Sequence, residues 1–122
     1  MARCMRRQGV QLLTELRVID NSVPARTIAK CAFVFRRRKI AVVGERIKVA
    51  CQGKMQNALV TGTRGYGPAS VHMHPAFGEN TCVLLDNNFE PVGTRIRGPL
   101  PTCLRKLGSK TAKVCAMATR FV

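Results

Sequence analysis

The residue types that most often carry out chemistry are sparse in this chain of 122 residues and form no recognisable site. No two of the six cysteines are spaced as C-x2–4-C, so the usual signature of a structural zinc site is missing. Most of them lie inside apolar runs, where a thiol behaves as a small hydrophobic side chain. We therefore expect reduced cysteines in a hydrophobic core, in preference to disulfides or metal ligands. The cysteines are Cys4, Cys31, Cys51, Cys82, Cys103 and Cys115.

Neither the histidines nor the acidic residues indicate a metal or catalytic centre. His72 and His74 fall on one side of an extended segment, but no third ligand stands at a motif spacing. The six acids are scattered, and no serine occurs in a nucleophile elbow. The glycine-rich run at residues 62–67 lacks the Gly-Lys-Ser/Thr ending of a phosphate-binding loop. The sequence predicts a protein that is not an enzyme and uses no cofactor.

The charge balance is the feature that indicates a partner. Lys and Arg total 21 against 6 Asp and Glu, which gives a formal net charge of +15. Self-repulsion on that scale opposes a compact state, and a polyanion such as nucleic acid would relieve it. Only 5% of the residues are aromatic and none is Trp, which disfavours a platform that stacks single-stranded bases. We expect contacts to phosphates and to the shape of folded nucleic acid.

The densest cationic block is at residues 36–39. It could be a solvated loop, but four adjacent cations cost folding free energy unless an anionic partner neutralises them. We therefore favour a phosphate clamp. Together with cations on a predicted loop, on the predicted basic strand and on the predicted C-terminal helix, it gives the predicted RNA-binding set: Arg26, Arg36, Arg37, Arg38, Lys39, Arg97, Arg105 and Lys106.

Short apolar segments must position these cations. Turn residues separate the segments every 8–12 positions, which indicates a small barrel of six or seven strands. Residues 46–51 alternate charged and apolar side chains, as a half-buried strand does. For residues 28–35 the predicted core face consists of Ala29, Cys31, Phe33 and Phe35.

The segment around which the chain is organised is residues 82–101. We predict a buried strand at residues 82–85, a turn at residues 86–88 and a basic strand at residues 92–98. Pro99 and Pro101 would end that strand, because proline cannot donate to a ladder.

The C-terminal part is predicted to contain one short helix. Thr102 would cap its start, Gly108 would follow its end, and Arg105 and Lys106 would point outward. Residues 112–122 are apolar and are predicted to be a further strand.

We divide the chain into a basic N-terminal extension, residues 1–14, and a single domain, residues 15–122. The extension contains three arginines and no acid, so it could be an organelle transit remnant or an RNA-binding arm. The chain has no apolar h-region of a signal peptide and no stretch of about 20 apolar residues that would span a bilayer.

Three blocks of sequence together resemble the universal large-subunit ribosomal protein fourteen family. The first has Asp20-Asn21-Ser22 followed by Ala25-Arg26, and the second has Arg38-Lys39 followed by Val43-Gly44-Glu45. The third and most specific contains Cys82-Val83-Leu84-Leu85, Pro91-Val92-Gly93-Thr94-Arg95-Ile96 and Gly98-Pro99. A short connection at residues 52–57 and the ending Arg120-Phe121-Val122 resemble the mitochondrial branch of this family.

The resemblance implies a mainly β fold, a closed five-stranded β-barrel with short C-terminal helices. It implies binding to large-subunit rRNA near the subunit interface of the mitochondrial ribosome, beside neighbouring ribosomal proteins. It also implies bridges to small-subunit rRNA and a docking site for the ribosome silencing factor. By motif, that docking site would include Thr94, Arg95 and Lys113.

Two other classes of protein remain as alternatives. A secreted cationic protein that binds anionic surfaces would need paired cysteines. A free-standing single-strand binder on a similar barrel is disfavoured by the low aromatic content.

Overall fold

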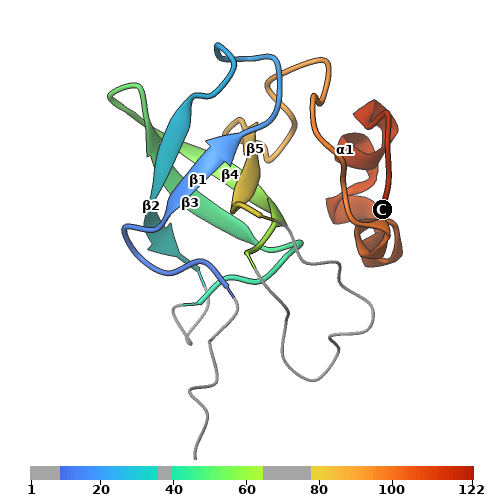
Figure 1. Cartoon of the computed structure of the whole chain (residues 1–122), viewed down its shortest axis with the longest axis horizontal. Helices are drawn as coiled ribbons and strands as arrows, with labels where there is room; N and C mark the ends of the chain where they lie inside the picture. Colours follow the sequence, from blue (N-terminus) through green and yellow to red (C-terminus); the bar gives the residue numbers. More distant parts are fainter. Residues whose placement is uncertain (1–8, 36–39, 65–77) are drawn as a thin grey trace, which may run out of the picture.

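The computed structural model describes residues 9–35, 40–64 and 78–122 and contains a closed five-stranded β-barrel (Figure 1). Adjacent strands pair antiparallel, except that β1 and β5 are parallel and close the barrel. The barrel and the short C-terminal helices confirm the fold that the family resemblance implies. The elements are β1 (Glu15–Val18), β2 (Ile28–Val34), β3 (Arg46–Cys51), β4 (Lys54–Gly62), β5 (Thr81–Leu85), the 3-10 segment η2 (Thr102–Lys110) and α1 (Ala112–Met117).

The interior of the barrel is the first of two hydrophobic cores. In β3 the inward residues Ile47, Val49 and Cys51 alternate with more exposed positions, as predicted. Val10 is also fully buried in this core and bridges Ala41. The apolar alternation of the strands is therefore the feature that fixes which side of each strand faces inward.

Strand β2 departs from the predicted alternation. Ala29 and Cys31 face the core as expected, but Phe33 and Phe35 are 52% and 49% exposed and Val34 is buried instead. The pairing register with β3 shifts between Cys31 and Phe33. An extra residue at such a β-bulge reverses the inward and outward sides of everything after it. The predicted core face was therefore wrong for the two phenylalanines.

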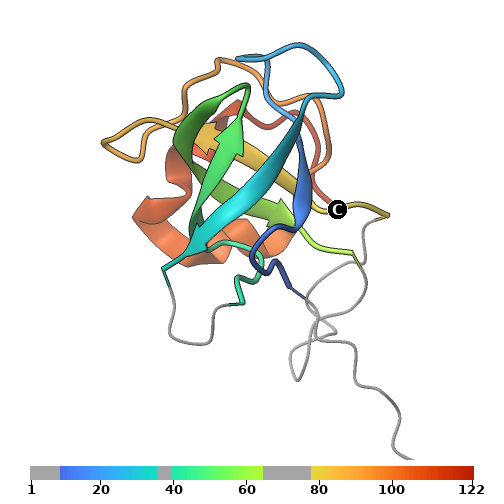
Figure 2. The ribbon, with the colours of Figure 1, turned by 90° about the vertical axis from the view of Figure 1, so that its left-hand side faces the viewer.

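A second core lies between the barrel wall and the C-terminal segment. All five residues of β5 are buried, because one face of the strand lines the barrel and the other is covered by the C-terminal segment. Figure 2 shows η2 and α1 packed against one side of the barrel. The covering side chains include Leu100, Leu104 and Val114. This contact holds the cationic C-terminal segment in a fixed position.

Two predictions made for the C-terminal segment are wrong. Residues 112–117 form helix α1 and not a strand, and only Phe121 makes an isolated bridge, to Leu100. Thr102 does not cap η2, since its hydroxyl donates to the carbonyl of Val122. Gly108 has a positive φ of 78° where two helical turns meet, a conformation that costs glycine little.

The predicted basic strand at residues 92–98 is also wrong. Within this segment only Ile96 makes an isolated bridge, to Asp20, and a second isolated bridge, Leu85 to Pro91, lies just before it. The turn before it is present, and the Asp86 carboxylate accepts hydrogen bonds from the backbone of Asn88 and Glu90. Residues 92–98 therefore form an ordered loop over the barrel.

Among the cysteines that the structure describes, Cys31, Cys51, Cys82 and Cys115 are free thiols. Burial raises the pKa of the Cys82 thiol far above its ordinary value, and it raises the pKa of Cys31 and Cys51 as well. Within the same residues, no helix is both long and apolar enough to cross a membrane.

Candidate RNA and docking interface

The turn at residues 20–22 organises the loop that carries Thr94 and Arg95. Asp20 is fully buried, and its two carboxylate oxygens accept hydrogen bonds from the Ser22 hydroxyl (2.7 Å) and from the backbone N–H of Leu84 (3.2 Å). A buried carboxylate must be hydrogen-bonded to be tolerated. These bonds fix the turn to β5 and thereby fix the direction of the neighbouring Asn21.

Asn21 holds the loop at residues 92–98 through both the oxygen and the nitrogen of its side-chain amide. Its Oδ1 accepts from the backbone N–H groups of Thr94 (2.8 Å) and Arg95 (3.1 Å), while its Nδ2 donates to the Thr94 hydroxyl (2.9 Å). The Asn21 N–H also donates to the carbonyl of Arg95. Gly93 permits this approach, because a Cβ there would stand 2.6 Å from Asn21 Oδ1. We call these contacts the Asn21 clamp.

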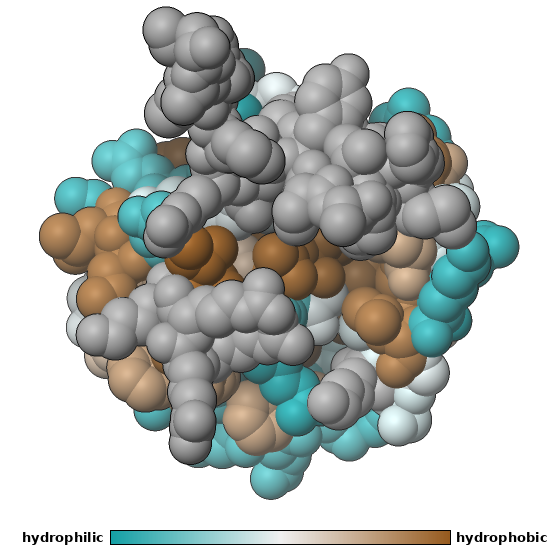
Figure 3. Space-filling view, turned by 90° about the horizontal axis from the view of Figure 1, so that it is seen from below, coloured by the Kyte–Doolittle hydropathy of each residue, from teal (hydrophilic) through white to brown (hydrophobic). Residues whose placement is uncertain are grey.

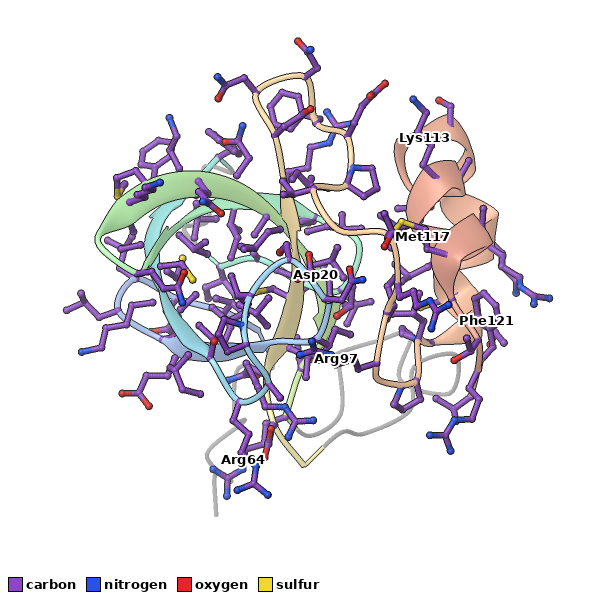
Figure 4. All side chains as sticks on the ribbon, turned by 90° about the horizontal axis from the view of Figure 1, so that it is seen from above. Asp20, Arg64, Arg97, Lys113, Met117 and Phe121 are labelled. Carbon is purple, nitrogen blue, oxygen red and sulfur yellow. The ribbon has the colours of Figure 1, made fainter. Side chains whose placement is uncertain are left out.

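The clamp leaves the predicted docking residues accessible. Thr94 and Arg95 are exposed, whereas the next residue, Ile96, is 2% exposed and anchors the loop in the second core. Lys113 is also exposed and forms an ion pair with Glu90. Figure 4 shows Lys113 on the C-terminal helical segment. The predicted docking residues therefore lie on one loop and on a helix that is ion-paired to Glu90, four residues before Thr94.

A further cation, Arg46, lies beside this ion pair and was missed as a site residue. Its guanidinium carbon stands 4.3 Å from the centre of the Phe89 ring, a cation–π distance. Arg46, Phe89, Glu90 and Lys113 all line a small pocket of about 170 Å³. In sequence, Arg46 is only the outward residue of an alternating strand, so no signal there could have identified it.

Arg26 and Arg97 come together through the loop that precedes β2. Arg97 is exposed, and its guanidinium donates to the carbonyl of Val23 (3.3 Å). Arg26, three residues further on, is exposed with a φ of 67°. The predicted RNA-binding residues Arg26 and Arg97 are thus carried by loops in direct contact.

Arg26 also lines an open groove of about 740 Å³ with two arginines that were not predicted as site residues. Arg17, on β1, forms an ion pair with Glu79 (3.2 Å), and Arg64 lies two residues after the end of β4. Figure 4 shows Arg64 well apart from the C-terminal helices. Only the closure of the barrel brings these positions, distant in sequence, to one groove.

Arg105 and Lys106 form a separate cationic region on η2. Both are exposed, as predicted, and the Arg105 guanidinium carbon lies 3.8 Å from the centre of the Phe121 ring. The phosphate clamp predicted at residues 36–39, which are Arg36, Arg37, Arg38 and Lys39, lies outside the described residues. His72 and His74 lie outside them as well. The predicted RNA-binding set is therefore divided between two regions of the described surface.

This arrangement defines a cationic β-barrel scaffold. In residues 9–35, 40–64 and 78–122, no three His, Cys, Asp or Glu side chains are grouped as a metal site would require. A family model for ribosomal protein L14p/L23e matches residues 9–122 of the chain. The chain therefore belongs to this ribosomal protein family, and it is a structural protein and not an enzyme.

Two relatives show the branch of the family. Large ribosomal subunit protein uL14m of Danio rerio is 38% identical over 118 residues, which cover 93% of this chain and 82% of the relative. The protein of the same name from Neurospora crassa is 30% identical over an aligned stretch of 130 residues, gaps included, that covers 89% of this chain and 96% of the relative. The chain belongs to the mitochondrial branch, and it is a structural protein of the large subunit of the mitochondrial ribosome.

Proposed function

We propose that the chain binds large-subunit rRNA near the subunit interface, through cations that the barrel holds at fixed spacing. The observation that supports this most directly is the exposure of Arg26, Arg97, Arg105 and Lys106, all on loops or on η2. Each can approach a phosphate without unfolding any part of the barrel. The cationic block at residues 36–39, whose placement is not described, completes the proposed set.

Salt dependence of RNA binding tests this proposal. If the exposed cations contact phosphates, the logarithm of the affinity falls with the logarithm of salt concentration by about 0.7–0.9 per contact. Replacing Arg97 by Gln should reduce that slope by about one contact. The measurement is a titration of a large-subunit rRNA fragment with the full chain at several salt concentrations, and a flat dependence would contradict the proposal.

We also propose that Thr94, Arg95 and Lys113 form the docking site for a ribosome silencing factor. The Asn21 clamp supports this, because it restrains the loop before any partner arrives and so lowers the entropy cost of binding. The site belongs to the surface that would face the small subunit. Bridges to small-subunit rRNA and contacts with neighbouring large-subunit proteins belong to the same proposal.

A charge reversal at Arg95 tests the docking site. Arg95→Glu should weaken binding of the silencing factor at least tenfold, while the melting temperature changes little because the side chain is exposed. Calorimetry with the purified factor gives the affinity, and Lys54→Glu, at the exposed first residue of β4, serves as the charge-matched control. Equal affinities for Arg95→Glu and the unmodified protein would show that Arg95 is not part of the docking site.

A further inference from the structure

Two phenylalanines are placed in solvent by the β-bulge in β2. Phe33 is 52% exposed and Phe35 is 49% exposed, whereas Val34 between them is buried. Without the register shift between Cys31 and Phe33, both rings would face the barrel core. Two adjacent half-exposed aromatic rings on a folded barrel form an apolar surface that a partner can cover.

The geometry of the pair leaves aromatic surface available. The ring centroids are 5.3 Å apart with an interplanar angle of 72°, an edge-to-face arrangement. In such a pair the edge of one ring covers one face of the other, and the remaining faces stay open. Figure 3, which looks toward the end of the molecule where β2 stops, shows hydrophobic surface interspersed with hydrophilic residues.

The residue that the pairing register places beside Phe33 is a cation. Strands β2, β3 and β4 contain four cations, Lys30, Arg46, Lys48 and Lys54, and none of the six acids of the chain. Lys48 is the register partner of Phe33 across the β2–β3 ladder and is exposed. An aromatic face therefore lies next to a cation, the combination that receives a base and its phosphate.

We infer that Phe33 and Phe35 form a stacking site for an unpaired nucleobase of RNA, with Lys48 beside it for the phosphate. The inference rests on the proposed RNA binding and deepens it by naming an unpaired nucleotide as the ligand. It also differs from the sequence expectation, in which the low aromatic content disfavoured stacking. The total number of aromatic residues is low, but the bulge turns two neighbouring phenylalanines outward onto the surface.

An apolar segment of a neighbouring protein is the competing occupant of the same surface. The observations favour RNA, because a protein segment on this surface would need its own acid to match Lys48, whereas a nucleotide supplies base and charge together. The two occupants also make different demands on the side chain. Stacking requires an aromatic face, while an apolar protein contact is satisfied by leucine.

The test compares aromatic, aliphatic and truncated side chains in the full chain. The probes are an RNA hairpin with an unpaired loop and a fully paired RNA duplex with the same number of phosphates. We expect Phe33→Leu and Phe33→Ala to weaken hairpin binding about tenfold each, with duplex affinity and the salt slope unchanged. Phe35→Leu and Phe35→Ala should weaken hairpin binding in the same way. Val92→Ala, at another half-exposed apolar position, should leave both affinities unchanged.

The outcomes separate this inference from the proposed function. If Leu restores the affinity that Ala loses, or if hairpin and duplex binding fall equally, the stacking site is wrong although RNA binding stands. If the unmodified protein binds neither probe, the proposed RNA binding itself fails. Thermal unfolding of each variant is measured alongside, and a melting temperature close to that of the unmodified protein excludes misfolding as the cause.

Discussion

At the residue scale, Asn21 is the side chain on which the docking loop depends most. It lies more than 70 positions before Thr94 in sequence and touches the loop only because the turn at residues 20–22 packs against it. The family resemblance was enough to select Thr94 and Arg95, but it did not say what holds them. That role follows from contacts that exist only in the folded chain.

Replacing Asn21 by Ala should loosen the loop. The variant loses three side-chain hydrogen bonds to Thr94 and Arg95, and we expect the free energy of unfolding to fall by about 1–2 kcal/mol. Hydrogen exchange at the amides of these two residues should be faster by about tenfold or more. Asn21→Asp is the matched control, because its carboxylate keeps the acceptor for both amides. Unchanged exchange in the Ala variant would show that the clamp does not order the loop.

The buried thiols give the protein a defined response to alkaline pH. Burial raises the pKa of Cys82, so the folded state keeps its proton at a pH where the unfolded chain, with a thiol pKa near 9.0, releases it. The stabilising contribution is therefore fully present below pH 9 and is lost as pH rises above it. Between about pH 8 and pH 10 this loss is about 1.4 kcal/mol for such a thiol.

Urea unfolding of the unmodified protein and of Cys82→Ala at both pH values measures this effect. The free-energy difference between the two proteins should shrink at the higher pH, because the variant has no thiol at position 82 to titrate. Comparing the two proteins at each pH cancels the contributions of lysines. A constant difference would mean that Cys82 ionises as readily in the folded state as in the unfolded chain.

At the scale of the elements, the second core decides where the C-terminal cations are held. Leu104 is fully buried against the barrel wall, whereas Leu107, one turn later in η2, is 46% exposed. The two leucines are three positions apart, a spacing that places both on one helical face, so the sequence pattern alone does not distinguish them. The docking of η2 onto the barrel makes that distinction.

We expect Leu104→Ala to lower the free energy of unfolding by about 2–4 kcal/mol, because it leaves a cavity between η2 and the barrel. Leu107→Ala removes the same atoms from a half-exposed position and should cost about 1 kcal/mol or less. Chemical denaturation of both variants gives the comparison. Equal losses would show that the second core does not hold η2 as described.

At the scale of the whole molecule, the net charge of +15 works against the isolated fold. The barrel compensates by burying apolar side chains in two cores, but the exposed cations still repel one another. The RNA-free protein should therefore be stabilised by salt. Between about 20 and about 300 mM NaCl we expect the melting temperature to rise by about 5 °C. A melting temperature that falls over this range would mean that attractive ion pairs outweigh the repulsion.

The sequence by itself determined the strands whose alternation is regular, such as β3, and the buried run of β5. It also determined the family, because the blocks around Asp20 and Thr94 are local patterns that can be read without coordinates. Its low aromatic content led to an expectation against base stacking, because composition does not reveal which rings a bulge exposes.

Only the tertiary structure decided the rest, and the reason is the distance in sequence between the contacting residues. The bulge in β2 depends on its register with β3, and the helix at residues 112–117 is short enough that packing against the barrel determines its conformation. The Asn21 clamp and the groove with Arg17, Arg26 and Arg64 join segments that meet only when the barrel closes. Local patterns define the regular strands such as β3, and closure of the barrel defines the surfaces that the strands present.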